Sequence, residues 1–184
     1  MSETVSASLQ RALRKSDMPS LIPVDDDIRL ERALPSQAKL YADTIANNVE
    51  HLSRWESWPR ITTPRLMEQR LRISPNTREA HYGIFDVTSL RGFVNMHSRD
   101  GRVAELGYWL TEEAVGKGVA TRAARTLADM CFRHLDIEKL RLNILLGNKK
   151  SMRVAERLGA KVVDYSPSTD LVTLELNKPS DLPG

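Results

Sequence analysis

The sequence predicts a single mixed α/β domain whose sheet is antiparallel in its first part and parallel where a helix crosses over. The hydrophobic patterns follow the order strand, two helices, three strands, helix, strand, helix, two strands. The length of 184 residues suits one domain with one core, and no internal repeat divides it. Parallel neighbours need a crossover connection, usually a helix, so we expect the parallel pair where single helices separate single strands.

The first half of the domain opens with a strand at 28–32. Ser36 is expected to cap a helix whose apolar residues recur at helical spacing from Tyr41 to Leu52, and Thr63-Pro64 to begin a second helix that runs to Ile73. An antiparallel meander is predicted next, with strands at 81–87, 92–97 and 103–110.

The second half opens on a glycine loop that leads into a long helix with an apolar stripe from Ala120 to Cys131. A strand at 140–146 precedes a helix at 149–158, for which Asn148 is the predicted N-cap and Gly159 the stop signal. The last two strands are predicted at 161–165 and 171–176.

The chain ends are expected to lie outside the domain. Residues 1–27 are rich in Ser and are predicted to be a flexible extension, residues 28–178 the folded domain, and residues 179–184 a C-terminal tail. The alternative for the extension is a short amphipathic helix over Val5–Leu13 that docks on a partner subunit.

Composition excludes several classes of protein. The 27 basic and 24 acidic residues are interspersed, which does not favour nucleic-acid binding. Cys131 has no partner for a disulfide, which suits a reducing compartment, and neither an apolar run of membrane-spanning length nor a signal peptide is present. We therefore expect a cytoplasmic protein.

The most informative motif joins a strand to a helix through a glycine loop. Strand residues Glu105–Leu110 lead into Val115-Gly116-Lys117-Gly118-Val119-Ala120 at the start of the long helix. Such a junction directs backbone N–H groups and the positive end of the helix dipole at one point, where an anion can bind. The spacing matches neither a P-loop nor a dinucleotide fingerprint. A diphosphate fits there, although two glycines at this spacing also close ordinary strand-to-helix turns.

Three further motifs make the chain resemble the RimL/RimJ-like branch of the GNAT N-acetyltransferases over about residues 28–177. They are A-E-[IL]-G-Y-W-L at Ala104–Leu110, N-x-x-S-x-x-V-A-E-R-x-G-[FA] at Asn148–Ala160, and a W-x-x-W-P-like segment at Trp55–Pro59. The resemblance implies the GNAT fold, a mostly antiparallel sheet of about seven strands with helices on both faces. It also implies transfer of an acetyl group from acetyl-CoA to a primary amine by direct attack in a ternary complex, without a metal.

The resemblance also implies which residues hold acetyl-CoA. The predicted contacts come from the end of the strand, the glycine loop and the following helix N-termini: Tyr108, Trp109, Leu110, Val115, Gly116, Lys117, Gly118, Val119, Ala120, Thr121, Asn148 and Ser151. A backbone N–H between Tyr108 and Leu110 is expected to meet the oxyanion. The family usually has Gln, Arg or His where this chain has Val115, so CoA binding is expected to be weaker but not absent.

Glu105 and Ser151 are the predicted catalytic residues. By the resemblance, Glu105 accepts a proton from the amine, through water, and Ser151 protonates the leaving thiolate. Many GNAT enzymes instead have a Tyr seven residues after the Asn, where this chain has Ala155. His97 is the reserve base, and it shares a strand face with Asn95, which could equally be a polar wall without proton transfer.

Trp55, Trp58, Asn95 and His97 are the predicted acceptor-binding residues. A flat apolar surface suits a ring or an alkyl amine, although aromatic residues at this spacing also suit a core. The acceptor, a protein N-terminus or a small-molecule amine, stays open, as does a homodimer. The alternative function is a non-catalytic acyl-CoA-binding regulatory module.

Overall fold

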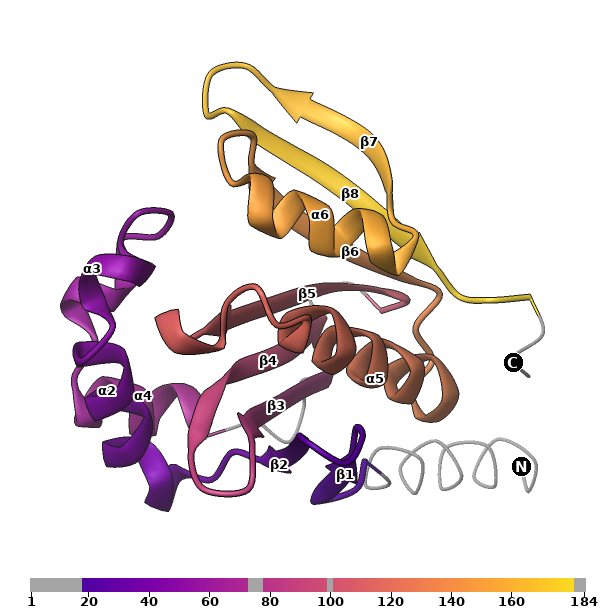
Figure 1. Cartoon of the computed structure of the whole chain (residues 1–184). Coiled ribbons are helices and arrows are strands. Elements are labelled where there is room, and N and C mark those ends of the chain that lie inside the picture. Colours follow the sequence, from indigo (N-terminus) through magenta and orange to yellow (C-terminus); the bar gives the residue numbers. More distant parts are fainter. Residues whose placement is uncertain (1–17, 73–77, 99–100, 181–184) are drawn as a thin grey trace, which may run out of the picture.

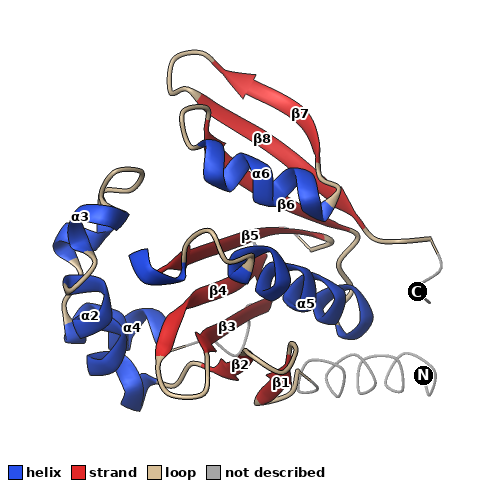
Figure 2. Cartoon of the chain, in the orientation of Figure 1, coloured by secondary structure: helices blue, strands red, loops and turns tan. Residues whose placement is uncertain are grey.

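In the computed structural model, which describes residues 18–72, 78–98 and 101–180, one eight-stranded sheet carries helices on both faces (Figure 1, Figure 2). The strand order is β1-β2-β3-β4-β5-β6-β8-β7, and all neighbours are antiparallel except β5 and β6. The strands are β1 Leu21–Pro23, β2 Arg29–Arg32, β3 Arg78–Phe85, β4 Leu90–Ser98, β5 Val103–Leu110, β6 Lys139–Leu145, β7 Lys161–Ser166 and β8 Leu171–Asn177. The helices are η1 Pro35–Gln37, α2 Ala38–Ala46, α3 Val49–Leu52, η2 Trp58–Ile61, α4 Pro64–Leu71, η3 Glu112–Ala114, α5 Val119–His134 and α6 Lys149–Leu158. The predicted mixed fold is confirmed, and the sheet is parallel where α5 crosses over between β5 and β6.

The folded domain begins earlier than the predicted residue 28. Strand β1 pairs with β2, Met18 and Ile22 are buried in the core, and Asp25 forms an ion pair with Arg122 of α5. A three-residue strand is too short to show the alternation that identifies strands in a sequence. The proposed helix over 5–13 and residues 181–184 of the tail lie outside the described residues.

The first predicted helix differs from the structure in two ways. Ser36 lies inside the 3-10 turn η1 and does not cap α2, which begins at Ala38 without a side-chain cap. The helix also stops at Ala46, because the Asn48 side chain donates to the Thr44 carbonyl at 2.9 Å and accepts from the Glu112 amide at 2.9 Å. By contrast, the predicted start of α4 at Thr63-Pro64 is confirmed, and Thr63 Oγ1 caps the helix by accepting from the Leu66 amide at 3.2 Å.

Helices α5 and α6 cover one face of the sheet, and α2 and α4 pack on the other. Successive strand residues face opposite sides, so Val94 joins the core under α5 whereas Phe93 packs with α2 and α4. The same alternation on β5 places Leu106 on the α5 face and Glu105 on the opposite face. This division decides which side of the sheet each candidate residue can serve.

Strands β5 and β6 pair only at their beginnings. Their register contains Val103 with Lys139, Ala104 with Leu140, and Glu105 with Arg141, and pairing then ends. Beyond it, β5 continues along β4 to Leu110, and β6 continues along β8 to Leu145. The two parallel strands therefore diverge, and a gap opens toward their carboxyl ends.

We expect the turn between β3 and β4 to depend on Asp86. One carboxylate oxygen accepts from the amides of Thr88 at 2.9 Å and Ser89 at 2.8 Å, and the other accepts from Arg91 at 2.5 Å. The Arg91 hydrogen bond, with these amides, lowers the pKa of Asp86 to about 2. Asp86→Ala should lower the free energy of unfolding by about 1–2 kcal/mol at pH 7.

The lowered pKa of Asp86 also predicts how this stabilisation changes with pH. The carboxyl of unfolded Asp titrates near pH ~3.9, so the stabilisation is complete above that pH and is lost as pH falls toward about 2. Urea unfolding of wild type and Asp86→Ala at pH 7 and pH 3 should show a smaller difference at pH 3. An equal difference at both pH values would contradict a role for the carboxylate charge.

Candidate active site

The glycine loop adopts a backbone that only glycine takes readily. Gly116 and Gly118 have φ of +84° and +74°, and a Cβ at either position would meet no heavy atom within 4 Å. Gly118 caps the 16-residue helix α5, whose first described helical hydrogen bond runs from the Arg122 amide to the Gly118 carbonyl. The amides of Val119, Ala120 and Thr121 therefore precede the helical ladder and point out of its N-terminus.

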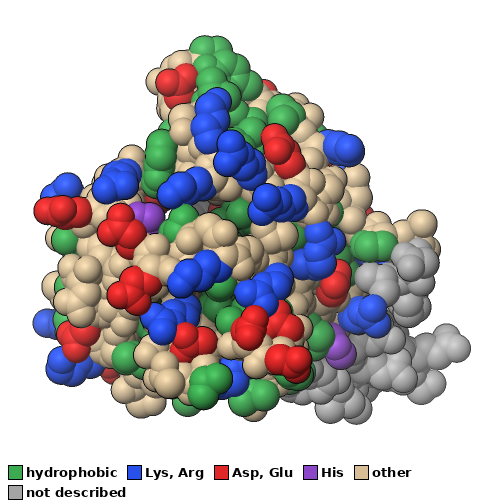
Figure 3. Space-filling model, in the orientation of Figure 1, with side chains coloured by type: hydrophobic (Ala, Val, Ile, Leu, Met, Phe, Trp, Pro, Cys, Tyr) green, Lys and Arg blue, Asp and Glu red, His purple; other side chains and the backbone are tan. Residues whose placement is uncertain are grey.

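The surroundings of this helix N-terminus favour an anion. Within the described part of the chain, the buried Thr121 Oγ1 finds no hydrogen-bond partner. Figure 3 shows Lys and Arg side chains over α5, α6 and the loop between β5 and α5, with Asp and Glu side chains among them. Lys117, Lys149 and Lys150 are exposed there, whereas the side chain of Val115 packs against the core and presents no polar group.

Backbone amides of β5 also point into the gap between β5 and β6. The Thr111 amide donates to the Arg91 carbonyl on β4 at 2.9 Å. Because successive amides of a strand point to opposite edges, those of Leu110 and Tyr108 point away from β4, toward β6. Of the three amides predicted to meet the oxyanion, those of Tyr108 and Leu110 therefore remain candidates, and the Trp109 amide is excluded because it points toward β4.

Helix α6 presents its N-terminus to the same gap. Its predicted cap is confirmed, because Asn148 Oδ1 accepts from the Ser151 amide at 3.1 Å, and Gly159 ends the helix with φ of +90°. The Tyr108 hydroxyl lies 2.8 Å from Ser151 Oγ, so a side chain of β5 meets the first turn of α6. Burial raises the pKa of Tyr108 to about 12, against the opposite effect of the Ser151 hydrogen bond.

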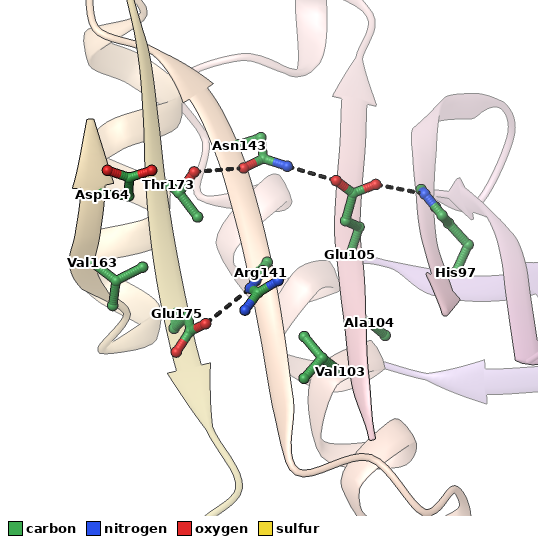
Figure 4. A pocket seen from close by; sticks show the side chains of 10 residues that line it. All are labelled: His97, Val103, Ala104, Glu105, Arg141, Asn143, Val163, Asp164, Thr173 and Glu175. Carbon is green, nitrogen blue, oxygen red and sulfur yellow. Dashed lines mark hydrogen bonds and ion pairs between the residues drawn. The ribbon is translucent and has the colours of Figure 1, made fainter. Parts of the chain in front are cut away.

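Glu105 is held by partners on both neighbouring strands (Figure 4). Its two oxygens lie 2.6 Å from His97 Nε2 on β4 and 2.6 Å from Asn143 Nδ2 on β6. Thr173 of β8 donates to Asn143 Oδ1 at 3.0 Å and so fixes the orientation of the amide. The carboxylate keeps acceptor sites beyond these two contacts, and the Glu105 side chain is 42% exposed. It can therefore accept a proton from a molecule that reaches it.

A pocket of about 420 Å³ opens beside this carboxylate, on the face opposite α5 and α6. Arg141 and Glu175 form an ion pair in its wall at 2.9 Å. Its lining residues are His97, Val103, Ala104, Glu105, Arg141, Asn143, Val163, Asp164, Thr173 and Glu175. The three carboxylates among them exceed the single arginine, which suits an acceptor that arrives as an ammonium ion.

The two tryptophans have different environments. Trp55 is 37% exposed, and its ring lies against Gly147 in the loop between β6 and α6. A Cβ atom added to that glycine would lie 3.4 Å from the ring. Trp58 packs against the buried apolar residues between the sheet and helices α2 and α4. Its ring lies 6.5 Å from the Trp109 ring, and the Arg70 guanidinium lies 5.8 Å from its centre. Trp55 thus borders the carboxyl end of the gap, while Trp58 has the core environment that its spacing also allowed.

The structure groups the predicted residues in two places. His97 and Glu105, weighed as alternative bases, are hydrogen-bonded to each other on one face, and Ser151 contacts Tyr108 on the other. Asn95 lies against Gly107 of β5, because a Cβ atom added to that glycine would lie 2.9 Å from Asn95 Oδ1.

Asn143 was not predicted. The alternation of polar and apolar residues in β6 could have identified it as facing the same side as Glu105.

The described residues contain no group of three or more His, Cys, Asp or Glu side chains suited to a metal ion. None of their helices has the length and apolar character that a membrane crossing requires.

The arrangement is the one expected of an acyl-CoA-dependent acyltransferase. Two parallel strands diverge, a glycine loop leads into a helix N-terminus, and a carboxylate lies where the strands part. The family comparison agrees with this class. Residues 27–161 match the family model described as an acetyltransferase (GNAT) domain. The chain therefore belongs to the GNAT family of acetyl-CoA-dependent N-acetyltransferases.

The relatives belong to the predicted branch. The chain is 30% identical over 146 residues to "Putative ribosomal N-acetyltransferase YdaF" of Bacillus subtilis, which covers 74% of this chain and 79% of that protein. It is 22% identical to the ribosomal-protein-serine acetyltransferase of Escherichia coli over 77% of this chain and 83% of that protein.

Solved structures share the fold. A RimL ribosomal L7/L12 α-N-protein acetyltransferase in complex with coenzyme A superposes with a TM-score of 0.78 at 19% identity, over 88% of this chain and 99% of that chain. The microcin C7 self-immunity acetyltransferase MccE, in complex with acetyl-CoA and AMP, gives a TM-score of 0.75 at 22% identity, over 87% of this chain and 97% of that chain. At these identities the likeness concerns the fold.

Proposed function

We propose that this chain transfers the acetyl group of acetyl-CoA to the N-terminal α-amine of a protein, with Glu105 as base and Ser151 as acid. One observation carries the proposal. Glu105 lies at the closed end of the gap, where β5 still pairs with β6, and the glycine loop follows the open end of the same strand. A single strand thereby relates the proton acceptor to the anion-binding helix N-terminus.

The loop residues fit the group that this function requires. Open space beside Gly116 and Gly118 and the amides that precede the α5 ladder are suited to a diphosphate, as is the Thr121 hydroxyl, which has no hydrogen-bond partner among the described residues. When bound, acetyl-CoA supplies a thioester carbon that an amine can attack. The amides of Tyr108 and Leu110 then offer donors for the developing oxyanion.

Side chains on the two faces of the sheet accept and donate the protons that the reaction moves. An α-amine has a reference pKa of about 7.7 to 8.0, so part of it is already unprotonated near neutral pH. Glu105 takes the proton that the amine loses on attack, directly or through a water molecule, while His97 and Asn143 hold its carboxylate in place. Ser151, in the first turn of α6, can protonate the leaving sulfur.

The acceptor class rests on the names of the relatives and on the pocket. YdaF and the RimL structure carry names that refer to ribosomal proteins. The pocket beside Glu105 is open and acidic, as an extended, positively charged chain terminus requires. A cytoplasmic location and a homodimer stay predictions from the sequence.

The test measures CoA release from acetyl-CoA with a panel of amines. Peptides with free N-termini should support turnover, the same peptides with blocked N-termini should not, and polyamines and aminoacyl-nucleotide analogues should be poorer acceptors. Preference for one of these small amines would overturn the acceptor class. CoA binding without turnover on any amine would favour the regulatory module.

Ser151→Ala should lower kcat by about 10- to 100-fold with little change in the KM for acetyl-CoA. The physical reason is that alanine removes the only side-chain hydroxyl in the first turn of α6. Arg153→Ala, on the exposed side of the same helix, is the control and should keep the wild-type kcat. A wild-type kcat in Ser151→Ala would remove the serine from the mechanism.

A further inference from the structure

The hydroxyl pair formed by Tyr108 and Ser151 is unexplained by strand or helix formation. Tyr108 belongs to β5 and Ser151 to α6, and their hydroxyl oxygens lie 2.8 Å apart. The Tyr108 hydroxyl also donates to the Ser151 carbonyl, at the longer distance of 3.3 Å. The usual O–H···O distance is ~2.5–3.0 Å, so the hydroxyl–hydroxyl contact is the strong one. The Ser151 carbonyl also has the Ala155 amide as its helical partner.

The direction of this hydrogen bond decides whether Ser151 can act. A serine hydroxyl carries one proton. If Ser151 donates to Tyr108, that proton is already engaged. If Tyr108 donates to Ser151 Oγ, the serine proton is free to point elsewhere, and the incoming hydrogen bond strengthens the one that the serine then donates.

Two features favour donation by the tyrosine. A phenol is a stronger acid than an aliphatic alcohol, and burial keeps Tyr108 protonated by raising its pKa to about 12. The Ser151 oxygen also lies at the positive end of α6, where electron density on it is stabilised as its proton moves away.

We propose that Tyr108 is a positioning residue for acetyl transfer, whose phenol donates a hydrogen bond to Ser151 Oγ and so directs the serine proton at the leaving sulfur. The inference rests on the role of Ser151 in the proposed function. Tyr108 keeps its own proton throughout, and Ser151, which has given its proton to the sulfur, takes up a proton from water before the next turnover. The hydrogen-bond path to the leaving group thus runs from Tyr108 on β5 to Ser151 on α6. At position 155, where many GNAT enzymes have a tyrosine, this chain has an alanine.

The test is a double-mutant cycle with Tyr108→Phe and Ser151→Ala, in which CoA release gives kcat and the KM for acetyl-CoA. Phenylalanine retains the ring packing and removes only the hydroxyl. Tyr108→Phe should lower kcat about 5- to 20-fold, leave KM within about twofold, and have no further effect once Ser151 is alanine. Tyr82→Phe is the matched control, since its hydroxyl donates to the Pro19 carbonyl at 2.6 Å, away from the gap.

The outcomes separate the inference from the proposed function. If Ser151→Ala is slow and Tyr108→Phe keeps the wild-type kcat, the inference is overturned and the role of Ser151 stands. If Tyr108→Phe slows the Ser151→Ala enzyme by the same factor as wild type, Tyr108 acts structurally and the inference is also overturned. If Ser151→Ala keeps the wild-type kcat, both the acid role and the inference fail, although turnover itself still supports N-acetyl transfer.

Discussion

Glu105→Gln is expected to lower kcat by about 10²- to 10³-fold, which is within the usual range for loss of a general base. Glutamine has nearly the same size and can still accept the hydrogen bond from Asn143, so the change removes chiefly the ability to bind a proton. CoA affinity should not change, because Glu105 lies at the closed end of the gap and points away from α5 and α6. Steady-state kinetics combined with calorimetric titration of CoA measures both quantities.

Glu79→Gln is the matched control for this prediction. Glu79 of β3 pairs in register with His97, which pairs in turn with Glu105, so the two glutamates flank the same histidine. Glu79→Gln should keep kcat near wild type. If Glu105→Gln stays fast while His97→Gln is slow, the histidine is the base. Fast turnover in both variants would mean that neither side chain takes the proton.

Gly118→Ala is expected to weaken CoA binding at least tenfold, which corresponds to about 1.4 kcal/mol. The left-handed conformation costs a residue with a Cβ about 1–2 kcal/mol, and Gly118 has φ of +74°. The added methyl group also enters the open space beside the loop, where the diphosphate is proposed to lie. Calorimetric titration with CoA tests this, with thermal unfolding as the measure of stability.

Gly101→Ala separates backbone strain from lost binding. Gly101 has φ of +82° and open space for a Cβ, but it precedes β5 instead of following it. It should lose stability to a similar extent and keep the wild-type Kd for CoA. Equal losses of CoA affinity in both variants would show that general destabilisation, and not the loop, controls binding.

Local signals predicted the parts of the structure that local physics controls. The meander, α5 and α6 lie within a few residues of their expected bounds, and the caps by Thr63 and Asn148 are present, because periodicity and capping act within a turn or a few strand residues. Strand β1 and the break after α2 escaped prediction. Both depend on distant partners, since β1 requires β2 and Asn48 contacts Glu112.

Within the site, the sequence by itself determined which backbone is suited to an anion. Two glycines ahead of a long amphipathic helix require a loop with open amides wherever the helix packs. Only the tertiary structure decided which side chains meet. Strand register brought His97 and Asn143 to Glu105, and the divergence of β5 from β6 let Tyr108 reach Ser151. These contacts join residues far apart in the chain, because they depend on which strands pair, in which register, and where the paired strands part.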